Sequence, residues 1–580
     1  MKLTKEHIRV AVVYVVLSFG AMVAAGGVFF VYKAVKRYVN RPTRFSPTIE
    51  FAVENGARVF AASSLDRIFQ DGKTLLEPTF TEQVSLTLAR HEYESFQVVV
   101  QAVDQEIRQV SLRLSDLAHE NGQDRIPSNQ LSWRVVGYVK TATPYYPVKY
   151  VGLWPDPLLP ARAVNIEQDK FQPFWVTVYA SKETVPGIYH GAVEVEVPGL
   201  PARKIPLTVK VYHFTLPVES RMKTAFDFYP HVTAARYPQK ENESDQAYQA
   251  RIEALNDAFL RTMLRYRINP ILNVDPTNSN EMARVDRLSV LGLNLFSVGK
   301  KGGTFENNWP KSKVDIEKLL PLYRTYGEIL KLNKFLTSTY IYTWDEGEIG
   351  NPVVPMLCSM IHRAYPGLRN LVCYHGFWDP VQNPEWGKDI DIWCFQIDKF
   401  DEGKIRKLQS RNVEVWTYPS GPSGLKTPNL ALDFDSIDYR ILPWLCWKYD
   451  IKGILYWCVN WWVNVDPFES ARNTRWKQNG NGLLFYPGEN GPLVSLRLEL
   501  LRDGLEDYEY FEALMRRLKS IRHLKQDPKY KTLFDISVKY LRVDTALARS
   551  MDDYTRDGEV LKCRRDILAG QIEEFDRLVK

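Results

Sequence analysis

The sequence predicts a multidomain α/β and all-β protein with four parts: an N-terminal transmembrane helix, a β-sandwich, a (β/α)8 TIM barrel and a C-terminal helical cap. Three observations support this prediction. An uncharged stretch lies near the N-terminus, segments with period-two alternation follow it, and short apolar strands then alternate with amphipathic helices. The length of 580 residues suits several domains of roughly 100–200 residues each. We place the four parts at residues 1–44, 45–217, 218–492 and 493–580.

The stretch Val10–Tyr32 is the predicted membrane anchor. Its 23 residues carry no charge, and a helix of that length would reach about 35 Å, enough to cross a hydrocarbon core of roughly 30 Å. A cleaved signal peptide is the alternative, because residues 21–25 include small side chains. The apolar run continues beyond them, which favours an uncleaved anchor. We therefore predict a single-pass protein bound to the membrane through this segment.

Charge and cysteine usage exclude several classes of function. Residues 1–44 hold eight Lys or Arg and one acidic residue, so the remaining 536 residues have a net charge of −1. A nearly neutral body lacks the basic surface that binding to a phosphate backbone requires, so nucleic acid is not an expected partner. The six cysteines form no CxxC pair and match no zinc-ligand spacing. We expect no metal and no organic cofactor.

Residues 48–217 have the pattern of β-structure. The segments 83–88, 96–100, 174–179 and 191–197 alternate apolar and polar residues or are rich in β-branched ones, and Pro186-Gly187 marks a turn. No long segment with a helical period interrupts them. We expect two packed antiparallel sheets.

Short apolar strands that alternate with helices predict the barrel. The helices are clearest at 245–266, 314–332 and 436–449, and the one after the second strand is poorly defined. Eight parallel strands over about 240 residues match the size of a (β/α)8 barrel. From Leu493 onward the pattern is helical and strand-free, which predicts a cap packed on the barrel. The strands are expected at Lys223–Tyr229, Pro270–Val274, Leu293–Val298, Ser338–Thr343, Asn370–Tyr374, Ile390–Gln396, Val413–Tyr418 and Gly453–Val459.

Carboxylates, amides and aromatic rings stand at the ends of these strands, where this fold carries its catalytic residues. Eleven of the 15 tryptophans fall between Trp344 and Trp476. The flat face of an indole suits the C–H face of a pyranose, and amides and carboxylates suit its hydroxyl groups, so we expect a carbohydrate site. His375 is either a base or a structural residue. The predicted substrate-binding residues are Asp227, His231, Tyr342, Trp344, Tyr374, His375, Trp378, Trp393, Trp416, Tyr418, Trp457, Trp461 and Trp462.

The adjacent residues Asp345 and Glu346 are the predicted catalytic pair. A glycosidase with its own nucleophile holds two carboxylates about 5–5.5 Å apart on opposite sides of the sugar. Chain neighbours, with Cα atoms about 3.8 Å apart, cannot easily attack from opposite faces. They can act together on one side, which fits cleavage assisted by the substrate's own 2-acetamido group. Asp345 would then orient that group, and Glu346 would be the general acid and base.

Several stretches of the chain resemble glycoside hydrolase family 123, over about residues 80–515. The resemblance implies a β-sandwich followed by a catalytic barrel, and retaining β-N-acetylgalactosaminidase chemistry through a neighbouring acetamido group. The family's Asp-Glu pair carries over onto Asp345 and Glu346. In one departure, Gly347 follows the pair where we expect Pro in many relatives. The similar stretches are Glu92–Gln97, Trp154–Pro160, Pro186–Gly191, Tyr342–Glu346, Gly480–Gly488 and Ser495–Tyr510.

We therefore predict an exo-acting retaining β-N-acetylhexosaminidase, with β-GalNAc as the expected sugar in a glycan or glycoconjugate. One alternative is a glycosidase of other specificity whose nucleophile is Asp227, Asp398 or Glu414. A second is a membrane-anchored carbohydrate-binding protein without catalysis, which the departure at Gly347 motivates.

Two further expectations concern location and the last motif. Amino-sugar polymers lie mainly outside the cytoplasm, so we expect an extracytoplasmic body, although the basic residues that flank the anchor weakly favour a cytoplasmic one. The charged block Ser495–Tyr510 is interpreted as ion pairs at the surface or between a helix and the barrel.

Overall fold

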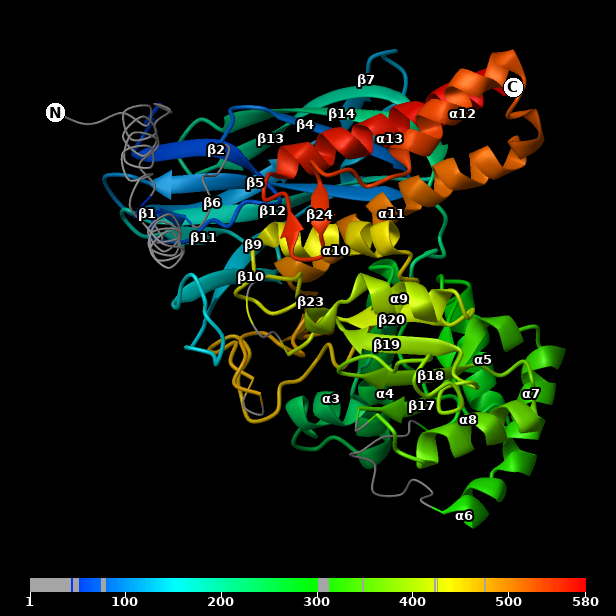
Figure 1. The fold of residues 1–580 in the computed structure, drawn as a ribbon. Coiled ribbons are helices and arrows are strands. Elements are labelled where there is room, and N and C mark those ends of the chain that lie inside the picture. Colours follow the sequence, from blue (N-terminus) through cyan, green and yellow to red (C-terminus); the bar gives the residue numbers. More distant parts are fainter. Residues whose placement is uncertain are drawn as a thin grey trace, which may run out of the picture.

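The structure is a computed structural model that describes residues 43–44, 52–74, 80–300, 312–346, 349–421, 424, 426–473 and 476–579. Figure 1 shows two β-sheets at the top of the molecule and a parallel sheet with helices at the bottom. The long helix α11 (Leu496–Ser520) runs between these two parts, beside α10 (Ser436–Tyr449).

Alternating apolar residues build the first half of the chain into two sheets that share a core of side chains such as Val98, Val176, Val193 and Val209. The strands predicted from period-two alternation lie in these sheets, and the strand pair β14–β4 is parallel while the other neighbours are antiparallel. The first sheet has the order β10 (Leu153–Leu159), β9 (Leu131–Lys140), β12 (Phe171–Ala180), β5 (Glu92–Ala102) and β2 (Ala57–Ser63). The second has the order β11 (Val164–Ile166), β6 (Ile107–Leu114), β13 (Gly187–Glu196), β14 (Arg203–Thr215) and β4 (Val84–Arg90), with the short strands β7 (Leu117–His119) and β8 (Arg125–Ile126) beside it.

Seven parallel strands form the sheet of the second half. Their order is β15 (Lys223–Phe226), β21 (Gly453–Tyr456), β20 (Glu414–Tyr418), β19 (Ile392–Gln396), β18 (Asn370–Tyr374), β17 (Thr339–Asp345) and β16 (Phe296–Ser297). Around them lie the helices α3 (Pro230–Arg236), α4 (Asp245–Arg265), α5 (Ser279–Ser289), α6 (Lys313–Glu317), α7 (Leu320–Leu332), α8 (Val353–Ala364) and α9 (Glu402–Gln409).

The prediction of a closed barrel of eight strands is wrong. The segment expected as the second strand, 270–274, makes only isolated bridges, between Phe226 and Pro270 and between Val274 and Val298. Two residues explain why. Pro270 has no N–H to donate to a ladder, and Asn273 has a φ of +51°, which is not a strand conformation. The sheet order therefore ends at β15 on one side and at the two-residue strand β16 on the other.

The predicted membrane anchor is also corrected. Among the residues that the structure describes, no helix is both long and apolar enough to cross a bilayer. This finding contradicts the expected single-pass, membrane-anchored protein with an extracytoplasmic body. The segment on which that prediction rested, Val10–Tyr32, lies outside the described residues.

The C-terminal region bridges the two parts of the molecule instead of capping a barrel. Helix α13 (Gly558–Leu578) packs on the second sheet, where the Asp566 carboxylate accepts hydrogen bonds from Thr87 (2.7 Å) and Tyr212 (3.0 Å). The region is not strand-free either, because it contains the hairpin of β24 (Ala548–Ser550) and β25 (Asp553–Tyr554). Helix α12 (Pro528–Tyr540) and the hairpin of β22 (Phe485–Gly488) and β23 (Gly491–Val494) complete it.

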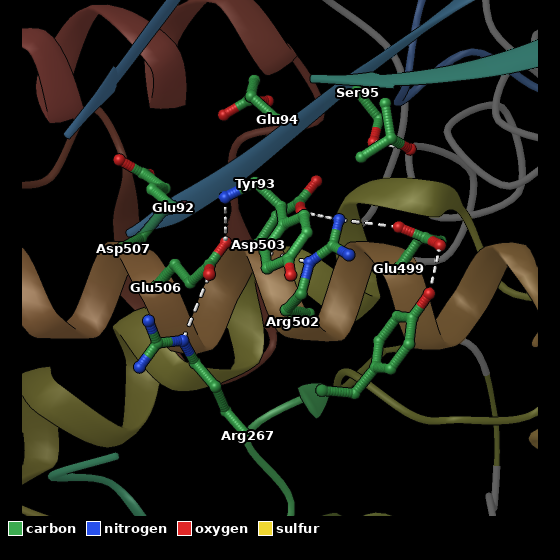
Figure 2. Close-up of polar contacts among 12 residues, drawn as sticks. Glu92, Tyr93, Glu94, Ser95, Arg267, Glu499, Arg502, Asp503, Glu506 and Asp507 are labelled. Carbon is green, nitrogen blue, oxygen red and sulfur yellow. Dashed lines mark hydrogen bonds and ion pairs between the residues drawn. The ribbon is translucent and has the colours of Figure 1, made fainter. Parts of the chain in front are cut away.

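Buried ion pairs, rather than surface ones, occupy the contact between β5 and α11. Figure 2 shows Glu506 between the Arg267 guanidinium (3.1 Å) and the backbone N–H of Tyr93 (3.3 Å), and Arg502 beside Glu499. We call this set of side chains the buried charge layer, because each has at most 6% of its surface exposed. Its members are Glu92, Glu94, Arg267, Arg440, Glu499, Arg502, Asp503, Glu506, Asp507 and Arg565.

Arg440 of α10 connects three elements through this layer. Its guanidinium donates to both carboxylate oxygens of Glu94 on β5 (2.9 and 3.2 Å) and to both of Asp507 on α11 (2.9 and 3.0 Å). The two arginines Arg440 and Arg565 hold the pKa of Glu94 near 2 although burial opposes this. Opposite charges at hydrogen-bond distance therefore stabilise the ionised form of this carboxylate.

At Glu509, on the same helix α11, the pKa is raised and not lowered as it is at Glu94. Its carboxylate accepts from the Arg221 N–H (2.5 Å) and the Ser220 hydroxyl (3.3 Å). Burial raises its pKa from 4.5 to about 7, and the more distant Arg267 offsets only part of that effect. The folded protein thus binds a proton here that the unfolded chain has lost above about pH 4.5.

Replacing Glu509 should change how stability depends on pH. The raised pKa contributes stability that is fully present below pH 4.5 and is lost as pH rises to about 7, with a slope of at most about 1.4 kcal/mol per pH unit. We expect Glu509→Gln, which cannot titrate, to weaken the fall in the free energy of unfolding between pH 4.5 and 7, as measured by urea unfolding. The exposed Glu328→Gln on α7 is the control. Equal pH slopes for wild type and Glu509→Gln would contradict the assignment.

Candidate active site

A cavity of about 570 Å³ opens at the C-terminal ends of the parallel strands. Clefts at this edge of α/β sheets are the usual place for ligands. Its wall contains the predicted catalytic pair together with aromatic and amide side chains. The lining residues are Tyr145, Tyr229, Tyr342, Asp345, Glu346, Cys373, His375, Gln396, Tyr418, Ser420, Gly421, Leu455, Trp457, Trp461, Trp476, Gln478 and Asn481.

A β-bulge in β17 turns Asp345 toward this cavity. The pairing of β17 with β18 shifts register between Tyr342 and Trp344, so that Trp344 lies opposite Val372 and Asp345 opposite Cys373. Tyr342 and Cys373 belong to the inner cluster of the sheet, whereas Trp344 and Val372 belong to the core on its outer side. Strict alternation from Tyr342 would have placed Trp344 inside and Asp345 outside. The extra residue reverses this, as bulges near functional sites often do.

Glu346 shares the cavity because the chain changes conformation after Asp345. Its φ is +54°, a left-handed value that is uncommon for a residue with a side chain. The Glu346 N–H still donates to the Cys373 carbonyl (2.9 Å), which ties this turn to β18. Successive residues of a regular strand point to opposite faces, so this change of backbone conformation is what allows two neighbours to line one cavity.

Two phenols hold the two carboxylates. Tyr342 donates to Asp345 Oδ1 (2.7 Å), and Tyr418 donates to Glu346 Oε1 (3.2 Å). Burial, more than any nearby charge, raises the pKa of both phenols well above the usual value, so both hydroxyls stay protonated. His375 lies beside this group, with Nδ1 3.0 Å from the Tyr418 hydroxyl and Nε2 3.6 Å from Glu346 Oε2.

Another part of the cavity wall is aromatic, and Asn481 holds it through hydrogen bonds. The Asn481 Oδ1 accepts from Trp457 Nε1 (2.8 Å) and from the Tyr456 hydroxyl (3.2 Å). The ring of Trp457 lies 5.3 Å from that of Trp461, and Trp461 lies 5.8 Å from Tyr229. Trp457, Trp461 and Tyr229 thus form a continuous aromatic surface in the wall of the cavity that also contains the carboxylates.

Arg497, on the first turn of α11, fixes the loop that carries Asn481. Its fully buried guanidinium donates to the carbonyls of Gly480 (2.8 Å) and Leu483 and forms an ion pair with Asp156 of β10 (2.8 Å). The charged block at the start of α11 therefore contacts two regions. Arg497 holds a loop of the cavity wall, and later residues of the block, such as Arg502, belong to the buried charge layer.

Five of the predicted substrate-binding residues line the cavity with Asp345 and Glu346: Tyr342, His375, Tyr418, Trp457 and Trp461. The other eight do not. Tyr374 and Trp393 alternate to the outer face of the sheet, where their rings stack 5.3 Å apart. Trp416 points inward but donates to Glu414 at the start of its strand, below the cavity. The remaining five are Asp227, His231, Trp344, Trp378 and Trp462.

These five lie behind or beside the cavity wall. Asp227 is buried and accepts from the Phe228 N–H, and His231 is exposed at the start of α3. Trp378 and Trp462 are buried in the outer core, where they donate to the carbonyls of Asn383 (2.6 Å) and Phe485 (2.9 Å). Trp344 joins them there because of the bulge.

Several lining residues escaped the sequence-based prediction. Tyr229 and Gln396 stand at predicted strand ends, where the same rule places them, but neither is among the predicted substrate-binding residues. Tyr145, Trp476, Gln478 and Asn481 come from loops, one of them in the first half of the chain, and no strand-end rule reaches them. The signal available for Asn481 was its place in the Gly480–Gly488 stretch.

Two family models match the chain. "Glycoside hydrolase 123, catalytic domain" matches residues 368–514, and "Glycoside hydrolase 123 N-terminal domain" matches residues 73–197. The chain belongs to glycoside hydrolase family 123. The predicted resemblance is thereby confirmed, and this family 123 member is a glycoside hydrolase that acts on a glycan. The catalytic-domain match begins after Asp345 and Glu346, so the case for these two residues rests on the geometry above.

One solved structure similar to this family 123 hydrolase supports the fold. A family 123 glycoside hydrolase from Clostridium perfringens, described for its hydrolysis of glycolipid glycans, has a TM-score of 0.65 at 14% identity and covers 90% of this chain and 99% of its own. A family 39 glycoside hydrolase from Bacteroides cellulosilyticus reaches a TM-score of only 0.32 at 9% identity, covering 73% of this chain and 82% of its own, which supports no argument. No curated protein matches the chain.

Gly482, next to Asn481, should be intolerant of a side chain. Its φ is +78°, and a Cβ would lie 2.4 Å from Cζ2 of Trp457. We expect Gly482→Ala to displace Trp457 and to lower the free energy of unfolding by more than the roughly 1–2 kcal/mol that a left-handed alanine costs. Gly199→Ala is the matched control, because Gly199 has a φ of +80° and open space around its Cβ. Equal losses for the two variants in denaturant unfolding would show that Trp457 does not limit this position.

Proposed function

We propose that the chain is an exo-acting, retaining β-N-acetylhexosaminidase, with β-GalNAc as the preferred sugar, and that the 2-acetamido group of the substrate is the nucleophile. The observation that carries the proposal is the set of carboxylates at the cavity. Asp345 and Glu346 are the only ones among its described lining residues, and they are chain neighbours. A pair on one side of a sugar supports cleavage in which the substrate attacks itself.

The chemistry assigns one role to each carboxylate. Asp345 accepts a hydrogen bond from the acetamide N–H and thereby orients the carbonyl oxygen toward C1. As that oxygen forms a bond to C1, the glycosidic bond breaks and Glu346 gives its proton to the departing oxygen. The resulting oxazolinium ring is opened by a water molecule whose proton returns to Glu346. Two displacements at C1 retain the configuration of the sugar.

The carboxylates considered as protein nucleophiles do not support the alternative mechanism. Glu414 lies at the start of β20, where it forms ion pairs with Lys223 and Arg369 (2.8 Å each). Asp398 accepts from Thr427 (3.0 Å), and Asp227 is buried beneath Tyr229. None of the three lines the cavity.

Substitution of the pair tests the proposal on aryl β-GalNAc, aryl β-GlcNAc and aryl β-galactoside. Removal of a general acid and base costs roughly 10²–10⁴-fold in rate, so we expect Glu346→Gln to lose at least 100-fold in kcat/KM on the acetamido sugars. Asp345→Asn should slow them as well, and wild type should leave the galactoside uncleaved. The exposed Glu402→Gln on α9 is the control. Comparable cleavage of the galactoside would refute assistance by the acetamido group, and full activity of Glu346→Gln would refute the assignment.

Tyr342→Phe tests whether the phenol positions Asp345. The hydrogen bond to a charged acceptor is worth about 1.5–3 kcal/mol, so we expect kcat on aryl β-GalNAc to fall roughly tenfold or more while KM changes little. Tyr340→Phe is a matched control, because Tyr340 points to the same inner face of β17 one alternation earlier and lies outside the cavity wall. If both variants lose the same activity, the effect of Tyr342 is structural and the positioning role fails.

A further inference from the structure

The mouth of the cavity carries two aromatic side chains that the mechanism above does not use. Tyr145 has 60% of its surface exposed and Trp476 has 40%, whereas the floor residues Tyr342, Cys373 and Leu455 have 1–3%. A large exposed aromatic side chain leaves apolar surface in contact with water, which is unfavourable. Such side chains cluster where a ligand or partner covers them. Both lie on the wall of the same cavity as Asp345 and Glu346.

The position of Tyr145 is set by hydrogen bonds between its loop and the loop that carries Asn481. Its hydroxyl accepts from Gln478 Nε2 (2.6 Å), and Gln478 Oε1 in turn accepts from Asn481 Nδ2. The Ala142 N–H donates to Asn479 Oδ1 (3.0 Å), and Asn479 Nδ2 donates back to the Ala142 carbonyl (2.7 Å). Because hydrogen bonds hold both the Tyr145 hydroxyl and the backbone of its loop, the ring is a preformed surface. A ligand can bind to such a surface with little loss of conformational entropy.

Tyr146 adds a second anchor directly beside this ring. It is 3% exposed, its hydroxyl donates to Asp433 (2.8 Å), and its ring meets that of Tyr145 edge-on at 5.2 Å. The loop from the first half of the chain is therefore also attached to the second half by Tyr146, a side chain that is not among the cavity-lining residues. This attachment fixes the position of Tyr145 at the mouth of the cavity.

The position of Tyr145 and Trp476 at the mouth of the cavity indicates which part of a substrate would contact them. An enzyme that removes a terminal sugar places that sugar at the closed end, beside the acid that protonates the leaving oxygen. The rest of the substrate must then leave through the open end, past Tyr145 and Trp476. A volume of 570 Å³ falls within the roughly 300–1,000 Å³ of pockets that enclose ligands larger than one sugar ring.

We propose that Tyr145 and Trp476 form a subsite for a second sugar, the one released as the leaving group, so that the preferred substrate is the end of an oligosaccharide chain rather than a single sugar on a small aglycone. This proposal rests on the proposed function, because it takes Glu346 as the acid at the scissile bond. The flat aromatic faces suit the C–H face of a pyranose, and the amide of Gln478 at the rim suits its hydroxyl groups.

Binding to the inactive Glu346→Gln variant tests the subsite. Calorimetry would compare the methyl β-glycoside of GalNAc with disaccharides in which β-GalNAc is linked to position 3 or 4 of galactose. We expect at least one disaccharide to bind roughly tenfold more tightly than the methyl glycoside, as about 1.4 kcal/mol of ring contact would give. Adding Trp476→Ala or Tyr145→Ala should remove that difference and leave the affinity for the methyl glycoside within about twofold. Tyr145→Phe, which keeps the ring, should retain most of the difference.

The controls separate the subsite from the proposed function and from misfolding. Both side chains are exposed, so the alanine variants should keep the wild-type thermal unfolding midpoint. Equal affinity of the methyl glycoside and every disaccharide, or equal losses for both ligand types in the alanine variants, would overturn the subsite. If wild type then still hydrolyses aryl β-GalNAc, only the subsite is wrong. If wild type cleaves no acetamido sugar and neither ligand type binds, the proposed function fails and the subsite with it.

Discussion

The contact between β5 and α11 is the constraint on which the arrangement of the whole molecule depends. Glu94 and Asp507, from these two elements, share the guanidinium of Arg440, and all three side chains are buried. Removing one partner of such a pair leaves an uncompensated charge in the interior, at a cost of about 3–5 kcal/mol. A shift of the sandwich along the helix would break several pairs at once. Buried charge therefore specifies one docking position here, whatever it adds to overall stability.

The same helix also connects the sandwich to the wall of the cavity. Arg497 lies two residues after Ser495, whose hydroxyl caps α11. The Arg497 guanidinium joins Asp156 of the sandwich to the carbonyls of Gly480 and Leu483. Asn481 lies within that loop and holds Trp457. The first half of the chain is thus more than a neighbour of the active site. Through Asp156 it supports the aromatic wall, and through Tyr145 it supplies part of the mouth.

The strand-end rule predicted those residues of the candidate site whose position follows from local sequence. Asp345, Glu346, His375 and Tyr418 directly end or follow parallel strands, and the rule finds them without knowledge of the fold. It also overpredicted, because it ignored the alternation of side chains: Tyr374 and Trp393 each point away from inward neighbours, Cys373 and Cys394. Loop residues such as Tyr145 depend on long-range packing that no local pattern encodes.

The errors in the fold have local physical causes that are visible only in retrospect. An apolar stretch around Pro270 looked like a strand, but a missing N–H and a left-handed Asn273 leave it with isolated bridges. The bulge in β17 is of the same kind, since one extra residue exchanged the faces of Trp344 and Asp345. A prediction from local sequence assumes an uninterrupted ladder of strand hydrogen bonds, and the ladder is interrupted at both places.

Those interruptions are also what makes a side-by-side acid pair usable. On a regular strand Asp345 and Glu346 would face opposite sides of the sheet and could not meet one sugar. The bulge turns the first residue inward, and the left-handed φ of the second brings it to the same cavity at a strain cost of order 1–3 kcal/mol. The hydrogen bond from the Glu346 N–H to Cys373, together with the phenols of Tyr342 and Tyr418, holds that conformation. Because the folded protein bears this strain before any substrate arrives, the two carboxylates would need no reorganisation in the cleavage that we propose.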